Sequence, residues 1–153
     1  MIKTQLLRSV IAFDYGNKNI GVATGQVITR QAQELCVLKA QNGVPNWTEV
    51  QSLIQEWKPD AIIVGLPINM DGSTSDMSSR AEKFSRRIHG RFNLPVYMQD
   101  ERLTTYEAKL QNTTKNSANY KKNPVDAIAA ALLLESWLQE NIPDNPTNIM
   151  ESL

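Results

Sequence analysis

The segment that most constrains the fold is residues 8–25, RSVIAFDYGNKNIGVATG. Two short apolar runs, Val10–Phe13 and Ile20–Ala23, flank a turn that contains Gly and Asn, a pattern typical of a β-hairpin. The first run ends on Asp14, and a carboxylate at the end of a buried strand must be solvated or matched by a cation. Asp14 could therefore open the turn with its side chain, or it could hold a ligand.

Gly16 and Gly21 lie on the two sides of this turn. Because glycine has no side chain, each position leaves room for another backbone or for a phosphate group close to Asp14. The sequence therefore allows a ligand to approach the end of the first strand.

The rest of the chain alternates between strand and helix patterns. Residues 60–66, DAIIVGL, are nearly all apolar, which is typical of a parallel strand covered on both faces. Residues 42–45, NGVP, indicate a turn, and Asn46 followed by Glu49 resembles the start of a helix. Further strands are predicted at 33–40 and 94–99, and helices at 47–57, 77–88, 104–110 and 125–138.

These elements predict an α/β fold with a mixed five-stranded sheet flanked by helices. At 153 residues the chain is long enough for one domain with a proper core. We expect this domain to span residues 1–142 and residues 143–153 to form a flexible tail. The last helix, at 125–138, is apolar on nearly all sides until Glu135, so we expect it to be deeply buried.

The composition argues against a membrane or secreted protein. No segment approaches the roughly 18 uninterrupted apolar residues of a membrane span, and the N-terminus lacks a signal-peptide pattern. Cys36 is the single cysteine, so no internal disulfide can form. A buried, inert thiol in a reducing compartment fits this residue, and we expect a cytoplasmic protein.

Charge is unevenly distributed along the chain, although 16 basic and 16 acidic residues cancel. Residues 77–122 carry ten basic and four acidic side chains, whereas residues 123–153 carry five acidic and no basic ones. A basic stripe recurs at helical spacing in the first of these ranges, at Arg80, Lys83, Arg87 and Arg91. Such a stripe is most often a solvated helix face, but it could also bind nucleic-acid phosphates.

Three acids occupy positions that could meet at one edge of the sheet. Asp14 ends the first strand, Glu101 follows the last strand, and Asp126 lies in the first turn of the buried helix. Ligands of open α/β sheets bind beyond the carboxyl ends of the parallel strands. Carboxylates there could hold two Mg²⁺ or Mn²⁺ ions, which would activate water against a phosphodiester. Each acid also has a structural explanation, because Glu101 could pair with Arg102 and Asp126 could stabilise the helix dipole.

Four segments resemble the YqgF/RuvX family and occur in the family's order. They are DYGNKNIGVA at 14–23, VGLPINMDGSTS at 64–75, DERLTT at 100–105 and VDAIAAALLLESWL at 125–138. Together they extend over most of residues 8–140. The family has an RNase H-like fold, is similar to the RuvC resolvases, and is described as Holliday junction resolvases and as nucleases that mature the precursor of 16S rRNA.

The resemblance implies a hydrolase, a two-metal-ion endonuclease that acts on structured nucleic acid with Mg²⁺ or Mn²⁺. The family's acidic positions match Asp14, Glu101 and Asp126, which would be both the metal ligands and the catalytic residues. Precursor 16S rRNA, processed at its 5′ end in ribosome biogenesis, is favoured over a four-way DNA junction. Expected partners include ribosome assembly intermediates but no membrane, and the protein would be a monomer or homodimer. The candidate contacts to nucleic acid are Lys18, Asn69, Ser73, Thr74, Ser75, Arg80, Lys83 and Arg102.

Two alternatives to a nuclease stay open. The family usually has arginine where this chain has Asn19, so one candidate phosphate contact is missing. The same basic surface would suit a non-catalytic RNA-binding factor in ribosome assembly. A nucleotide-binding, kinase-like domain is the other alternative, because Asp-X-Gly hairpins also hold phosphates in such proteins. Those proteins need two lobes around the nucleotide, and this chain is long enough for one.

Overall fold

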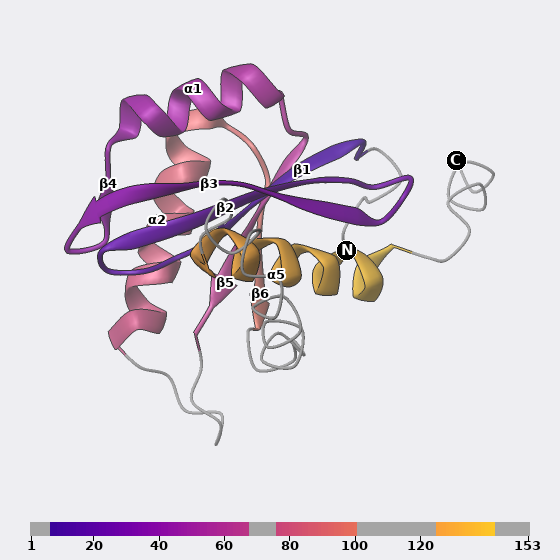
Figure 1. Cartoon of the computed structure of the whole chain (residues 1–153). Coiled ribbons are helices and arrows are strands. Elements are labelled where there is room, and N and C mark those ends of the chain that lie inside the picture. The colour runs from indigo at the N-terminus through magenta and orange to yellow at the C-terminus, as the bar shows by residue number, and fades with distance from the viewer. Residues whose placement is uncertain (1–6, 68–75, 101–124, 143–153) are drawn as a thin grey trace.

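The computed structural model describes residues 7–67, 76–100 and 125–142 (Figure 1). The predicted helix at 104–110 and the predicted tail at 143–153 lie outside these ranges. The described elements are β1 (Ser9–Asp14), β2 (Asn19–Gln26), β3 (Gln31–Gln41), β4 (Val44–Pro45), α1 (Trp47–Trp57), β5 (Ala61–Leu66), α2 (Asp76–Phe92), β6 (Val96–Asp100) and α5 (Val125–Asn141).

The strands form one mixed sheet in the order β4-β3-β2-β1-β5-β6. β1 to β4 pair antiparallel in chain order, whereas β5 pairs parallel with β1, and β6 pairs parallel with β5. The predicted mixed α/β sheet is confirmed, with one strand more than the five expected. The additional strand is β4, which pairs Val44 and Pro45 with the end of β3, where the sequence predicted only a turn.

Helices cover both faces of the sheet. α5 packs against one face, and the residues of β1 and β5 in that cluster are Val10, Ala12, Ala61 and Ile63. α1 and α2 pack against the other face, and the intervening residues in that second cluster are Ile11, Phe13, Ile62 and Val64. The apolar strand at 60–66 is therefore covered on both faces, as its sequence predicted.

The helix boundaries follow from local chemistry. The Asn46 side chain accepts a hydrogen bond from the Thr48 amide at 2.9 Å and caps α1. α1 ends at Lys58, whose left-handed backbone (φ 46°) lets its amide bond to the Ile54 carbonyl. α5 has eight buried side chains and is among the most buried elements described, as predicted. Within the described ranges, no helix is both long and apolar enough to cross a membrane.

Candidate active site

Asp14 is the last residue of β1 and lies on the face of the sheet that α5 covers. Side chains alternate between the two faces of a strand, and Val10 and Ala12 of β1 pack in the α5 cluster. Asp14 is the next residue in that series and is half-buried. Asp14 therefore lies at the C-terminal end of β1, on the α5 side of the sheet.

Gly21 brings Asp126 next to Asp14. Gly21 is the direct antiparallel partner of Asp14, so the two residues face the same side of the sheet. A Cβ atom built on Gly21 would lie 1.8 Å from the carbonyl oxygen of Asp126. The backbone of the first turn of α5 therefore rests on Gly21, directly beside the acid at the end of β1.

This contact changes the interpretation of both glycines near the turn. The room that the sequence left for a ligand at Gly21 is occupied by the backbone of α5. At Gly16, a Cβ atom would lie 2.3 Å from the carbonyl oxygen of Asn19, so that glycine allows the hairpin to close tightly. Gly21 therefore accommodates the backbone of α5 and Gly16 accommodates the closed hairpin, and neither glycine opens space for a ligand.

Small residues of β2 let α5 pack this closely along its length. Gly21, Ala23 and Gly25 alternate along β2 toward α5. At Gly25, a Cβ atom would lie 2.9 Å from a methyl group of Leu134. Because both ends of the contact are tight, the position of the first turn of α5, and with it Asp126, is fixed by the sheet.

The described part of the site fits a hard divalent cation. Asp14 and Asp126 supply carboxylate oxygens, the ligands that Mg²⁺ and Mn²⁺ prefer. Glu101, the other predicted ligand, lies outside the described residues and directly follows Asp100, the end of β6. Within the described ranges, no cluster of three His, Cys, Asp or Glu side chains is placed to bind a metal.

Asp60 sits at the opposite edge of the sheet and has a structural role. Its carboxylate accepts hydrogen bonds from the amides of Arg8 at 2.8 Å and Ser9 at 3.1 Å. These bonds hold the start of β1 beside the start of β5. Asp60 is therefore not a candidate for the active site.

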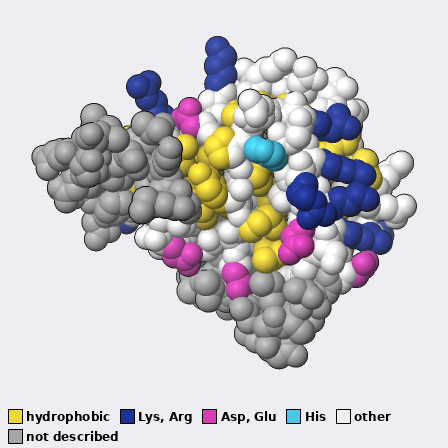
Figure 2. Space-filling view, turned by 180° about the vertical axis from the view of Figure 1, so that it is seen from behind, with side chains coloured by type: hydrophobic (Ala, Val, Ile, Leu, Met, Phe, Trp, Pro, Cys, Tyr) yellow, Lys and Arg dark blue, Asp and Glu magenta, His cyan; other side chains and the backbone are white. Residues whose placement is uncertain are grey.

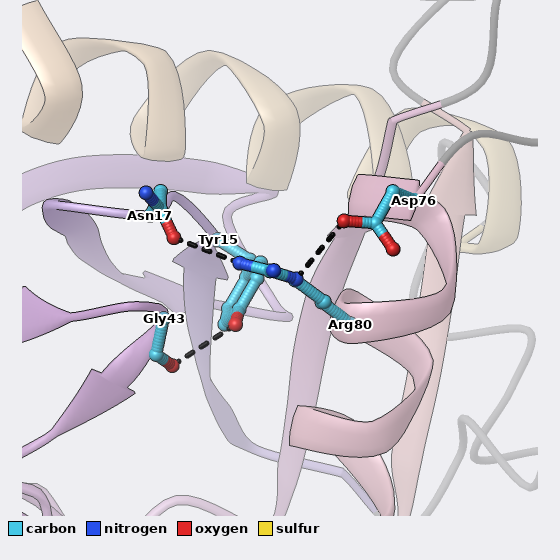
Figure 3. A network of polar contacts seen from close by, with 5 residues as sticks. All are labelled: Tyr15, Asn17, Gly43, Asp76 and Arg80. Atoms are coloured by element: carbon cyan, nitrogen blue, oxygen red, sulfur yellow. Dashed lines mark hydrogen bonds and ion pairs between the residues drawn. The ribbon is translucent and has the colours of Figure 1, made fainter.

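On the other face of the sheet, Arg80 of α2 reaches the turn that follows β1 (Figure 3). Its guanidinium donates to the side-chain oxygen of Asn17 at 3.0 Å and pairs with the Asp76 carboxylate at 3.2 Å. In the same view, the buried Tyr15 hydroxyl donates to the Gly43 carbonyl at 3.0 Å. Tyr15 and Arg80 thus connect the β1–β2 turn to the β3–β4 turn and to α2.

Three basic side chains of α2, Arg80, Lys83 and Arg87, lie near Tyr15. Burial raises the pKa of the Tyr15 phenol, while the nearby charges of Arg80 and Arg87 act to lower that pKa. A hollow of about 170 Å³ lies beside it, and its lining includes Tyr15, Asn42, Trp47, Arg80, Lys83 and Arg87. Space-filling shows Lys and Arg side chains gathered on one side of the molecule (Figure 2).

The predicted basic stripe divides into two parts. Arg80, Lys83 and Arg87 line the hollow, whereas the Arg91 guanidinium lies 4.3 Å from the centre of the Trp47 ring. Arg91 therefore stacks on an aromatic ring of the protein. Trp47 and Tyr15 were missed by the sequence reasoning because neither has a signal that distinguishes it from a core aromatic residue.

Of the remaining predicted contacts, the structure describes Lys18. Lys18 is exposed in the β1–β2 turn, where its carbonyl accepts from the Ala40 amide at 2.9 Å. Lys39 lies opposite Asn19 and donates to its side-chain oxygen at 3.2 Å, which places a cation beside the position where the family usually has arginine. Outside the described residues lie Asn69, Ser73, Thr74, Ser75 and Arg102.

Sequence comparison supports the predicted family. The model described as "RuvX: Holliday junction resolvase" matches residues 8–140. A protein of Pseudomonas fluorescens (strain Pf0-1) is 65% identical over 137 residues, which cover 88% of this chain and 94% of that protein. A protein of Pseudomonas aeruginosa (strain LESB58) is 62% identical over 145 residues, covering 94% and 100%. Both carry the name "Putative pre-16S rRNA nuclease".

Solved structures support the predicted fold. Thermus thermophilus RuvC in complex with a Holliday junction has a TM-score of 0.56 at 15% identity, covering 88% of this chain and 98% of that chain. The fowlpox virus Holliday junction resolvase has a TM-score of 0.53 at 17% identity, covering 86% and 99%. At such identities the likeness concerns the fold alone, and it confirms the RNase H-like architecture.

The sheet, the two adjacent segments that carry Asp14 and Asp126, and the family match agree with one another. The predicted enzyme class, a nuclease that hydrolyses phosphodiester bonds, is confirmed by the family model and the relatives. The chain belongs to the RuvX family.

Proposed function

We propose that this nuclease is a metal-dependent endonuclease of structured RNA, which holds two Mg²⁺ or Mn²⁺ ions with Asp14, Glu101 and Asp126. The observation that carries the proposal is the contact at Gly21. It sets the first turn of α5 beside the strand end that bears Asp14. The segments that carry two of the proposed ligands, Asp14 and Asp126, thereby lie side by side although they are far apart in the sequence.

The protein's own contribution is to fix this arrangement before substrate binds. A bound divalent ion supplies an activated water and charge stabilisation for the leaving oxygen. Asp14 is held by β1, which is paired on both sides, and Asp126 is held by a helix seated on β2. Such pre-positioned ligands need little rearrangement during the reaction.

Precursor 16S rRNA, cut near its 5′ end, is the substrate that we favour. The support is the name of relatives that are 62% and 65% identical to this chain. Processing of ribosomal RNA would place the protein in the cytoplasm with ribosome assembly intermediates, as a monomer or homodimer. Phosphate contacts would come from Lys18, Asn69, Ser73, Thr74, Ser75, Arg80, Lys83 and Arg102.

A four-way DNA junction is the second candidate substrate. Its support is the family description and the likeness to RuvC solved with a Holliday junction. That likeness is at 15% identity and concerns the fold. RNA is favoured because the relatives named for RNA share far more of the sequence.

Cleavage assays on both substrates test the proposal. Wild type, Asp14→Asn and Asp126→Asn are incubated with a precursor rRNA fragment and with a four-way DNA junction, each with Mg²⁺, Mn²⁺ or chelator. Asparagine keeps the size of aspartate but removes a ligand charge, so both variants should lose metal-dependent cleavage. Thermal melts establish that each variant is folded.

The outcomes separate the alternatives. If Asp126 only stabilises the helix dipole, Asp126→Asn should lose about 0.3–1 kcal/mol of stability and keep full cleavage. Glu82→Gln removes an exposed carboxylate from α2 and serves as the matched control, with wild-type cleavage expected. Equal cleavage by wild type and Asp14→Asn would refute the site. Cleavage of the junction but not of the RNA would overturn the choice of substrate.

A further inference from the structure

We infer that the hollow between α2 and the β3–β4 turn is a separate binding site for one phosphate group of the nucleic acid. The inference rests on the proposed function and adds a defined contact point to it. The hollow has a volume of about 170 Å³ and is formed by residues far apart in the sequence. It lies on the face of the sheet opposite to the acids.

The position of the hollow follows from two consecutive residues of the chain. Tyr15 packs in the core cluster on the side of α1 and α2, and it lines the hollow. Asp14 precedes Tyr15 and lies on the side of α5. A nucleic-acid strand that passes over the end of β1 would therefore meet the hollow on one side and the acids on the other.

The hollow carries an excess of positive charge. Arg80 is matched by the Asp76 carboxylate at 3.2 Å. Lys83 and Arg87 also line the hollow, and neither forms an ion pair with any residue that the structure describes. Both are exposed on α2, so among the described residues their two positive charges have no ion-pair partner and can attract an anion.

The hydrogen-bonding groups suit an acceptor such as phosphate. Phosphate oxygens accept hydrogen bonds, and the ammonium of Lys83 and the guanidinium of Arg87 can only donate them. The Tyr15 hydroxyl already donates its hydrogen to the Gly43 carbonyl at 3.0 Å, so it is not available to donate to a phosphate. The walls thus offer cationic donors above an aromatic base made of Tyr15, Trp47 and Phe84.

The hollow is large enough for a phosphate group. Its volume of about 170 Å³ is well above the roughly 10–15 Å³ that one water needs on the same measure. The group could be an internal phosphodiester or a terminal phosphomonoester, and the two share the chemistry that the site recognises.

Binding measured without metal tests the inference independently of cleavage. Fluorescence anisotropy with chelator present compares two single-stranded RNA oligonucleotides, one with a 5′-phosphate and one with a 5′-hydroxyl. The test protein is the double variant Lys83→Gln/Arg87→Gln. Arg86→Gln is the matched control, because Arg86 is exposed on the same helix and lines a different hollow beside His89 and Val96.

We expect the double variant to bind RNA roughly tenfold more weakly and, because one phosphate contact is lost, to reduce the slope of log affinity against log salt by about 0.7. The control should change affinity less than twofold. Equal weakening on both oligonucleotides supports an internal phosphodiester. Loss of a wild-type preference for the 5′-phosphate supports a terminal one.

A double variant that binds both oligonucleotides as Arg86→Gln does would overturn the inference. Melting curves verify that the variants are folded. The proposed function fails separately, because it would be refuted by metal-independent cleavage or by an active Asp14→Asn variant. The loss of RNA affinity by the double variant is measured without metal, so it does not depend on either cleavage result.

Discussion

The two faces of the sheet meet at the end of β1 and are built in opposite ways. The face under α5 has small residues on β2, Gly21, Ala23 and Gly25, so helix backbone and strand backbone touch. The face under α2 is filled by large side chains such as Phe13 and Phe84, whose rings meet at 5.6 Å. The first face fixes acids through backbone contact, whereas the second carries long cationic side chains around its rim.

This difference indicates a division of roles. Ligands of a catalytic metal must be held within a fraction of an ångström, and backbone packing provides such precision. Phosphate contacts tolerate flexible side chains, because their attraction is mainly electrostatic and falls slowly with distance. Substitutions that disrupt one face at a time test this division.

The largest effect should come from Gly21→Ala. The added Cβ would lie 1.8 Å from the Asp126 carbonyl oxygen, so α5 must move away from the sheet. We expect a loss of about 3 kcal/mol in the free energy of unfolding and loss of metal-dependent cleavage. Urea unfolding and the cleavage assay measure the two effects. Wild-type stability with wild-type cleavage would show that this contact does not position Asp126.

Gly90→Ala is the control for that change. Gly90 lies in α2, and a Cβ atom there would have no atom within 4 Å. Alanine favours a helix over glycine, so the free energy of unfolding should rise by about 0.5–1 kcal/mol. Gly21→Ala should therefore lower the free energy of unfolding, whereas Gly90→Ala should raise it.

Tyr15→Phe should have the next largest effect. The change removes the hydroxyl that donates to the buried Gly43 carbonyl at 3.0 Å. Leaving that carbonyl without its partner should cost about 1–3 kcal/mol, measured by urea unfolding. An unchanged unfolding midpoint would mean that the hydrogen bond between the β1–β2 turn and the β3–β4 turn contributes nothing to stability.

Arg91→Gln should separate the two parts of the basic stripe. Arg91 lies over the Trp47 ring, so its loss should lower stability by about 0.5–1 kcal/mol through the missing cation–π contact. The salt dependence of RNA binding should stay close to that of wild type, unlike that of Lys83→Gln/Arg87→Gln. A clearly reduced slope for Arg91→Gln would instead assign Arg91 to the RNA-binding surface.

The smallest effect concerns Cys36 on β3. The residue is half-buried, whereas the sequence predicted a buried thiol. Burial raises the pKa of the Cys36 thiol, and the charges of Glu49 and Glu56 raise it further. The folded chain binds the thiol proton more tightly than the unfolded chain, which stabilises the fold. This stabilisation is present below about pH 9, the ordinary pKa of the thiol, and is lost as the pH rises further. Iodoacetamide should label native Cys36 more slowly than the urea-unfolded chain at pH 8. Equal rates would contradict the raised pKa.

Much of the fold was predictable because the signals are local. The hairpin at 8–25, the apolar strand at 60–66 and the apolar helix at 125–138 each have a period or composition that requires one structure. β4 was missed because two residues, Val44 and Pro45, have no periodicity of their own and pair only because β3 continues beside them.

The site was harder to predict because its contacts connect distant segments. Asp14 and Asp126 could be proposed as ligands from their places at element ends. Their segments are adjacent because the backbone of α5 packs against Gly21. That contact depends on the distance between the helix and the sheet, which the sequence does not give. The hollow likewise combines Tyr15, Trp47 and Lys83 from three elements, and no sequence spacing relates them.

The most direct test of the central claim is calorimetric titration of Mn²⁺ into wild type, Asp14→Asn and Asp76→Asn. Asp76 is an exposed acid that pairs with Arg80 on the α2 side, so its variant matches the chemical change without touching the α5 face. If the acids beside α5 hold the metal, Asp14→Asn should lose at least about tenfold in Mn²⁺ affinity. Asp76→Asn should bind Mn²⁺ like wild type. Unchanged Mn²⁺ binding by a folded Asp14→Asn would contradict the account.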